Sequence, residues 1–327
     1  MSEVEQPFVS TGDLPSPEQV EALVTEAYER YRAESAGATS AVYPALAEVP
    51  AELFGIAVVG TSGAVFSVGD ATVEFTIMSV AKPFVFALVC EALGAEETRE
   101  RVGVNGTGLP FDSLEAIDLR GDGRTNPMVN AGAIATTSLL PGPDAAARWR
   151  QLVEGLSRFA GRTLSVSEDV YRSASATNHR NRQIAAVLHE RRRVYCDPAD
   201  AVDLYTRQSC LAVTARDLAA MGATLADGGV NPITGERVVD AATCRSTLAV
   251  MTTAGLYETS GDWLYDVGLP GKSGIGGGIV VVSPGKGGLG TFAPPLDEAG
   301  NSVRGQLAAR FLSRRLGLDL FLSKPVR

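Results

Sequence analysis

A serine and a lysine three positions apart stand at the start of an apolar, helix-like segment of this chain. Ser79 and Lys82 form an S-x-x-K pattern. Residues at this spacing share one face of a helix, so a neutral lysine amine could accept the proton of the serine hydroxyl. Unpaired N–H groups in the first helical turn would also favour the negative charge that develops during acyl transfer to serine. The pair is therefore a candidate nucleophile and base.

The pattern alone is a weak signal, because the chain contains it twice. Ser283 and Lys286 have the same spacing, but the Pro-Gly pair between them predicts a turn after a strand rather than a helix. The two histidines, His179 and His189, leave a Ser-His-Asp triad open by count. Their positions, at a predicted helix start and beside a run of arginines, favour surface roles instead.

A second candidate element is the K-S-G box Lys272-Ser273-Gly274, which leads through a glycine run into a C-terminal strand. A phosphate-binding loop is excluded, because Asp266 stands where its first glycine would be and no helix follows. A K-[ST]-G box on an edge strand that faces an S-x-x-K helix is the layout of serine hydrolases with the β-lactamase fold. The backbone N–H groups of Ile275 and Ser79 could then form an oxyanion hole. The alternative is a glycine-rich hairpin without a functional role.

Length, charge and cysteine content limit the class of protein. The 327 residues are 45% hydrophobic, which suffices for one large core or for two lobes that share a cleft. A net charge of −9 leaves no basic excess for binding nucleic acid. The acidic start Met1–Glu5 and the lack of a long apolar run predict a cytoplasmic protein without signal peptide or membrane span. Four widely spaced cysteines favour buried thiols over a zinc site or disulfides.

The predicted elements divide into strands near the chain ends and helices in the middle. Ser16 and Gln19 form a capping box that opens the first helix. Strands are predicted at 55–60, 64–68, 72–77, 278–283 and 289–293, and helices at 79–94, 144–160, 178–192, after Pro198, and at 214–228, 240–254 and 302–316. We therefore expect a single α/β domain of the α+β type over residues 1–327. Its sheet lobe would span about 40–78 and 262–327, and its helical lobe about 79–255.

Several longer strings occur in the order that one known family shows. They are Tyr43-Pro44-Ala45-Leu46, the segment around Ser79, residues 126–134 (NPMVNAGAI), Arg180-Asn181, Asp203-Leu204-Tyr205, residues 229–237 (GVNPITGER), Gly255-Leu256-Tyr257, the K-S-G box and Pro294-Pro295-Leu296-Asp297. On these strings the chain resembles the serine-dependent glutaminases over about residues 20–320. The resemblance implies a β-lactamase/transpeptidase-like fold, hydrolysis of L-glutamine to L-glutamate and ammonia, no cofactor, and a homodimer or homotetramer.

The resemblance also implies roles for individual residues. It makes Ser79 the nucleophile and Lys82 the group that deprotonates it, and it places the backbone N–H groups of Ser79 and Ile275 at the oxyanion. The side chains that it places around the glutamine are those of Tyr43, Asn130, Asn181, Tyr205 and Tyr257. Without the resemblance, the tyrosines would be ordinary residues at the edge of a core, and Asn130 a buried structural amide.

The chemistry makes two further demands on the site. Lys82 can act as a base only if its pKa lies well below the usual value of about 10.4, which burial and a second cation would achieve. Lys272 is the obvious second cation. The leaving ammonia must receive a proton, and Tyr257 or Tyr205 would relay it, with the sequence unable to choose between them.

One position departs from the family pattern. Family members usually carry a glutamate seven positions before the asparagine equivalent to Asn181, and it receives the α-ammonium group of the substrate. Ala174 stands there, which predicts amino-acid binding weaker by roughly one to two orders of magnitude. Glu168 or Asp169 could supply the missing charge. Two alternatives to a glutaminase follow: a related serine amidase or β-lactamase-like hydrolase whose substrate lacks the free α-amino group, and a non-catalytic homologue.

Overall fold

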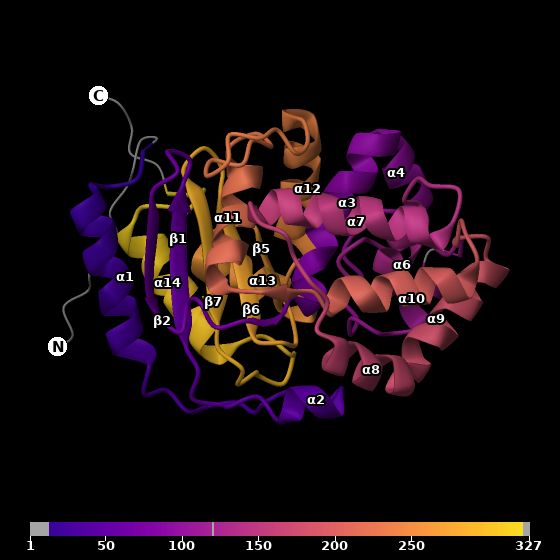
Figure 1. Ribbon diagram of the computed structural model, residues 1–327, viewed down its shortest axis with the longest axis horizontal. Helices are drawn as coiled ribbons and strands as arrows, with labels where there is room; N and C mark the ends of the chain where they lie inside the picture. The colour runs from indigo at the N-terminus through magenta and orange to yellow at the C-terminus, as the bar shows by residue number, and fades with distance from the viewer. Residues whose placement is uncertain (1–12, 120, 323–327) are drawn as a thin grey trace.

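A five-stranded antiparallel sheet and a group of helices lie side by side in the computed structural model, which describes residues 13–119 and 121–322 (Figure 1). The strand order is β2-β1-β7-β6-β5. The strands are β1 (Gly55–Gly60), β2 (Val65–Gly69), β5 (Gly271–Ser273), β6 (Gly278–Ser283) and β7 (Gly287–Phe292). Both ends of the chain thus contribute to one sheet, as the sequence predicted, and β5 with its K-S-G box is an edge strand.

Helices cover both faces of the sheet (Figure 1). On one face, Ile279 and Val281 pack with α1 (Pro17–Tyr31) and α14 (Val303–Arg315). On the other face, Val280 and Val282 pack with α11 (Ala215–Ala226). The remaining helices are α2 (Pro44–Ala47), α3 (Ala81–Leu93), α4 (Ala95–Val102), α5 (Glu115–Asp118), α6 (Asn130–Ser138), α7 (Ala145–Ala160), α8 (Glu168–Thr177), α9 (His179–Glu190), α10 (Pro198–Ser209), α12 (Ala241–Ala254) and α13 (Ser260–Val267).

Helix α11 packs directly on β7, although it belongs to the middle segment that we expected to form a helical lobe. The close approach requires glycine in the strand. A Cβ atom at Gly288 would lie 2.2 Å from the carbonyl oxygen of Ala219, and one at Gly290 would lie 2.1 Å from that of Ala215. Backbone contact of this kind is possible only where the residues of the strand that face the helix are glycines. The division of residues 1–327 into two lobes stays a prediction.

One predicted strand was wrong in extent. Only Phe75–Thr76 of the segment 72–77 forms a strand, β3, and it pairs with β4 (Ala212–Val213) outside the main sheet. The chain turns after β2, where Val73 N donates a hydrogen bond to the carbonyl of Asp70 at 3.1 Å. The segment therefore leaves the sheet and leads toward Ser79.

Local signals from the sequence can be compared with the structure at several places. The capping box of Ser16 and Gln19 is present at the start of α1. Three of the four free cysteines are buried, but Cys196 is only half-buried, so its predicted burial was wrong. The segment Met1–Glu5 lies outside the described residues.

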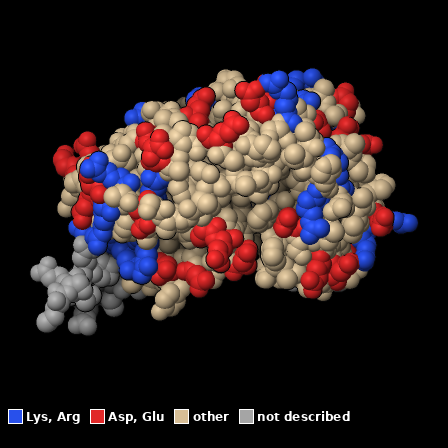
Figure 2. All heavy atoms as spheres, turned by 90° about the horizontal axis from the view of Figure 1, so that it is seen from below, with Lys and Arg blue, Asp and Glu red and all other residues tan. Residues whose placement is uncertain are grey.

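Two surface properties bear on the predicted partners. Among the described residues, no single helix is long and apolar enough to cross a membrane, and residues 78–93 and 95–102 meet that criterion only as a pair bent by 120°. On the face drawn in Figure 2, lysine and arginine side chains alternate with aspartate and glutamate rather than gathering into one basic surface.

Candidate functional site

Ser79 lies in a single 3₁₀ turn, Met78–Val80, that leads into α3. The predicted helix therefore begins two residues later than expected, and Ser79 precedes it. Met78 has a φ of +47°, a conformation that costs a residue with a side chain roughly 1–2 kcal/mol. The serine is only 8% exposed, and Lys82, the second residue of α3, is 2% exposed. The fold thus holds a strained turn and a buried amine at one place.

Lys82 belongs to a hydrogen-bonded network of side chains from four helices. Its Nζ donates to Asn130 Oδ1 at 2.7 Å, and Tyr205 donates from its hydroxyl to the same oxygen at 2.9 Å. Asn130 Nδ2 donates to Asn181 Oδ1 at 2.9 Å. Asn130 is the first residue of α6, and its backbone N–H donates to the carbonyl of Phe111 at 2.8 Å. Asn130 therefore connects the buried amine to two other residues that we expected at the site.

Burial determines the protonation of both lysines. It lowers the pKa of Lys82 to about 7, while the negative charge of Asp112 acts in the opposite direction. Burial also lowers the pKa of Lys272 far below its usual value, and the charge of Lys82 lowers it further. The expected effect of burial on Lys82 is therefore present, and the repulsion between the two amines acts on the pKa of Lys272. Lys82 is poised to exchange a proton near neutral pH.

The K-S-G box lies against the Ser79 turn. A Cβ atom at Gly274, the residue after β5, would approach Ser79 N to 3.1 Å, so this glycine lies in close contact with the backbone of the serine. Lys272 Nζ donates to the carbonyl of Ser273 at 2.7 Å and lies 3.9 Å from the centre of the Tyr257 ring. The hydroxyl of Tyr257 donates to the same carbonyl at 3.3 Å. The box therefore brings a second buried amine and a tyrosine beside Ser79.

Three tyrosines around the serine retain their protons at neutral pH. Burial raises the pKa of Tyr43 and of Tyr257 to about 12 and that of Tyr205 well above its usual value. Hydrogen bonding to Ser79 acts in the opposite direction on the pKa of Tyr205 and of Tyr257. Tyr257 has a φ of +58°, so a second strained residue adjoins the serine. The hydroxyls of Tyr205 and Tyr257 therefore lie near Ser79 in protonated form.

A cavity of about 120 Å³ opens onto the serine. Of the residues expected at the site, those that line it are Tyr43, Ser79, Asn130, Asn181, Tyr205 and Ile275. Lys82, Tyr257 and Lys272 are not among its lining residues and are buried. The cavity is therefore lined by the expected binding groups and by the serine, with the amines outside its lining.

The charges of this cavity differ from expectation. Ala174 forms part of its wall and is fully buried, but neither Glu168 nor Asp169 lines it. Asp169 instead pairs with Arg172 at the surface. The carboxylate that does line the cavity is Asp112. Sequence reasoning missed it, because it lies in a loop that matches no motif.

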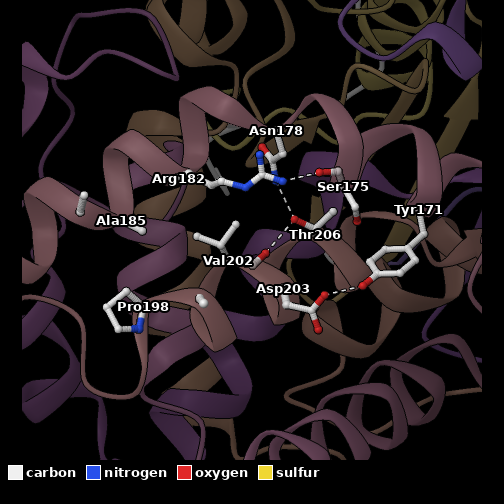
Figure 3. A pocket seen from close by; sticks show the side chains of 11 residues that line it. Tyr171, Ser175, Asn178, Arg182, Ala185, Pro198, Val202, Asp203 and Thr206 are labelled. Carbon is white, nitrogen blue, oxygen red and sulfur yellow. Dashed lines mark hydrogen bonds between the residues drawn. The ribbon is translucent and has the colours of Figure 1, made fainter.

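A larger cavity of about 410 Å³ lies between α8, α9 and α10 (Figure 3). Asn178 and Thr206 line both cavities and form a shared wall, in which Asn178 Nδ2 donates to Thr206 Oγ1 at 2.7 Å. On the far side of that wall, Arg182 donates to the carbonyl of Ser175, and the Tyr171 hydroxyl donates to Asp203 (Figure 3). The lining of the larger cavity includes no lysine.

The other sequence candidates lie away from this site. Ser283 ends β6, and Lys286 follows in the turn, where its Nζ donates to the carbonyl of Gly317 at 2.9 Å. The predicted turn is confirmed. His179 and His189 are both exposed on α9, which confirms their predicted surface positions and leaves neither beside Ser79.

A serine before a buried helix, with a K-S-G strand against it at the edge of an antiparallel sheet, is the arrangement of serine hydrolases with the β-lactamase-like fold. Comparisons with known proteins identify the family within this class. A family model described as Glutaminase matches residues 37–321. The chain belongs to the glutaminase family.

Individual relatives extend over nearly the whole chain. Glutaminase 2 of Yersinia pestis is 66% identical over 318 residues, which cover 97% of this chain and 94% of that protein. A glutaminase of Brucella canis is 50% identical over 305 residues, covering 92% and 96%. A solved structure described as probable glutaminase ybaS superposes with a TM-score of 0.93 at 41% identity, covering 94% of this chain and all of that one. A structure described as Mglu in its glutamate form gives 0.87 at 39% identity, covering 95% and 70%.

Proposed function

We propose that this chain hydrolyses L-glutamine to L-glutamate and ammonia, with Ser79 as nucleophile and Lys82 as its base. Lys82 takes the proton of the Ser79 hydroxyl, and Ser79 Oγ bonds to the carbon of the side-chain carboxamide. Collapse of the tetrahedral intermediate breaks the C–N bond, and the nitrogen leaves as ammonia after receiving a proton. Water then cleaves the glutamyl ester and restores the serine. None of these steps needs a cofactor.

The other candidate residues have roles in the same scheme. The backbone N–H groups of Ser79 and Ile275 would stabilise the oxyanion, because unpaired amides beside a developing negative charge lower its energy. Tyr205 or Tyr257 would pass the proton to ammonia, since burial keeps both hydroxyls protonated at neutral pH and both are near enough to Ser79 to hydrogen-bond with it. Asn130 and Asn181 would hold the substrate amide and carboxylate, Tyr43 would close the cavity, and Lys272 and Ser273 would support β5.

The observation that carries this proposal is the buried amine of Lys82, which lies 2.7 Å from Asn130 Oδ1 and has a pKa of about 7. A lysine with an ordinary pKa would be protonated at neutral pH and unable to accept a proton. The names of the relatives support glutamine as the substrate. We further propose a single two-lobed domain, a cytoplasmic location and a homodimer or homotetramer, with the 90% exposed Tyr265 as a candidate interface residue.

Ala174 favours a second candidate, a serine amidase for substrates that lack the α-amino group. The cavity wall is apolar where the family usually offers a carboxylate. Such an enzyme would use the same nucleophile and base on another amide, so a comparison of substrates distinguishes the two candidates.

Release of ammonia from L-glutamine by the Ser79→Ala variant tests the proposed function. We expect kcat to fall by about 10³-fold or more, as is usual when the nucleophile of a hydrolase is removed. Ser283→Ala is a matched control, because it removes a buried serine from the other S-x-x-K pattern, far from the cavity. It should keep native activity. Full activity in Ser79→Ala would refute the proposed mechanism.

A further inference from the structure

The cavity at Ser79 carries two opposite charges. Among the described residues that line it, Asp112 and Arg180 alone are charged. Their side chains are 41% and 47% exposed, so both stand where the cavity meets solvent. The serine, asparagine and tyrosine groups described above line the rest of the cavity. A ligand that binds here therefore meets a neutral polar end and a charged end.

Asp112 is held beside the reacting groups by its neighbour in sequence. The carbonyl of Phe111 accepts the hydrogen bond from Asn130 N, and the Phe111 ring packs on Tyr257 with centroids 4.9 Å apart. Asn130 in turn binds Lys82. The negative charge of Asp112 acts on the buried network and raises the pKa of Lys82 and of Tyr205. For Lys82, burial lowers the pKa by much more than this charge raises it. The backbone that carries this carboxylate is thus held by Asn130, the residue that also binds the Lys82 amine.

Arg180 adjoins Asp112 without satisfying its carboxylate. Arg180 Nε donates to the backbone carbonyl of Asp112 at 2.9 Å, but it lies 3.9 Å from Asp112 Oδ2. Charge-assisted hydrogen bonds between such groups are about 2.7–2.9 Å long, so the two side chains are neighbours rather than a closed ion pair. An α-amino acid can contact both side chains, because its ammonium and carboxylate groups have opposite charges and are attached to the same carbon atom.

We propose that Asp112 binds the α-ammonium group of glutamine and Arg180 its α-carboxylate, while the side-chain amide lies at Ser79. The inference rests on the proposed function for the identity of the substrate. It assigns the ammonium site to Asp112, because Ala174 stands where the family usually carries a glutamate. An amino-acid amide would then be preferred over an amide without the α-amino group, even though the wall at position 174 is apolar.

Three amides separate the two charges in a test. L-Glutamine carries both groups, 4-carbamoylbutanoate lacks the ammonium group, and L-glutamine α-amide lacks the carboxylate. Hydrolysis of each side-chain amide, followed by chromatography of the product, gives kcat/KM for the native chain, Asp112→Asn and Arg180→Gln. Asp118→Asn is a matched control, because it breaks a surface ion pair with Arg191 outside the cavity. Melting temperatures show that each variant is folded, and Asp112→Ser replaces Asp112→Asn if that variant is not.

The expected pattern is selective. Asp112→Asn should lower kcat/KM for L-glutamine relative to 4-carbamoylbutanoate by about tenfold, the low end for a charged contact that is partly screened by solvent. Arg180→Gln should lower kcat/KM for L-glutamine relative to the α-amide by a similar factor. Asp118→Asn should change neither ratio. These ratios cancel any effect that a substitution has on Lys82, because the base acts on all three compounds.

Several outcomes would overturn the inference. An equal fall for all three amides in Asp112→Asn would show that the carboxylate acts only through Lys82 or the Phe111 loop. Equal kcat/KM values of the native chain for 4-carbamoylbutanoate and for L-glutamine would also overturn it. The proposed role of Ser79 in hydrolysis would stand in that case. Conversely, activity that survives Ser79→Ala would refute the proposed mechanism, yet the substrate ratios would still decide whether Asp112 binds the ammonium group.

Discussion

Two cavities share the wall formed by Asn178 and Thr206, but Ser79 lines the smaller one and not the larger one. The cavity of about 410 Å³ is bordered by an arginine, an aspartate and a tyrosine that already have partners (Figure 3). The cavity of about 120 Å³ is lined by Ser79 and adjoins a lysine with a pKa of about 7. Volume therefore does not identify the site in this molecule, whereas buried titratable groups beside a nucleophile do.

The two cavities also differ in the backbone that surrounds them. Among the described residues, three non-glycine residues have positive φ, and two of them, Met78 and Tyr257, adjoin Ser79. Such conformations persist only where neighbouring contacts hold them, and they concentrate at functional sites. The helices around the larger cavity include none of these residues. Strain and pKa thus separate the two regions in the same way, and substitutions in each region can test that separation.

Substitution of Asn130 by aspartate should have a larger effect on activity than any change in the shared wall or in the larger cavity. The proposed mechanism needs neutral Lys82, so kcat/KM of the native chain should fall about tenfold per pH unit below about 7 as the amine gains its proton. In Asn130→Asp, a negative charge would replace the amide oxygen that lies 2.7 Å from Lys82 Nζ, and would raise the lysine pKa by roughly 1–3 units. Activity at pH 7 should fall accordingly and return at higher pH.

The pH dependence of kcat/KM for both proteins, together with their melting curves, checks this prediction. An unchanged midpoint in a folded Asn130→Asp variant would mean that Lys82 is not the group whose protonation limits activity. Loss of activity at every pH would point to a role for the amide nitrogen, which donates to Asn181 in the native chain.

The wall between the cavities should matter for stability more than for chemistry. Thr206→Val removes a hydroxyl that accepts from Asn178 Nδ2 and donates to the carbonyl of Val202, each at 2.7 Å. Asn178 and Thr206 are both 4% exposed, so loss of this hydrogen bond to the buried Asn178 amide should lower the free energy of unfolding by about 1–3 kcal/mol. Urea denaturation measures this loss. Thr252→Val is a matched control, because that hydroxyl donates to the carbonyl of Leu248 in its own helix at 2.8 Å, and its loss should cost less.

The local spacing of residues was enough to single out Ser79, Lys82 and the K-S-G box, which the structure brings together, because each pattern spans only three or four residues. Asn130, Asn181 and Tyr205 come from three different helices, so only the family resemblance connected them. Asp112 could be predicted by neither route, since the Phe111 contact that places it joins segments far apart in sequence.

The errors in secondary structure have a similar cause. Helices α4 and α8 were not predicted, because they bury only two residues and one residue respectively and hold few large apolar side chains. The segment 72–77 has the composition of a strand, but only two of its residues find a partner, and that partner is β4. Composition can indicate that a segment suits a sheet, whereas pairing depends on where the rest of the chain lies.

The smallest effect should come from the larger cavity. Arg182 is exposed, and its guanidinium donates a hydrogen bond to the carbonyl of Ser175 (Figure 3). Arg182→Ala should therefore change kcat/KM for L-glutamine by less than about twofold and the free energy of unfolding by less than about 1 kcal/mol, as is usual for exposed charged residues. Steady-state kinetics and urea denaturation on the same preparation check both values. A rise in KM of fivefold or more in a variant of native stability would instead place the larger cavity on the path of the substrate, and the two regions would then be parts of one binding site rather than a reactive cavity and an inert neighbour.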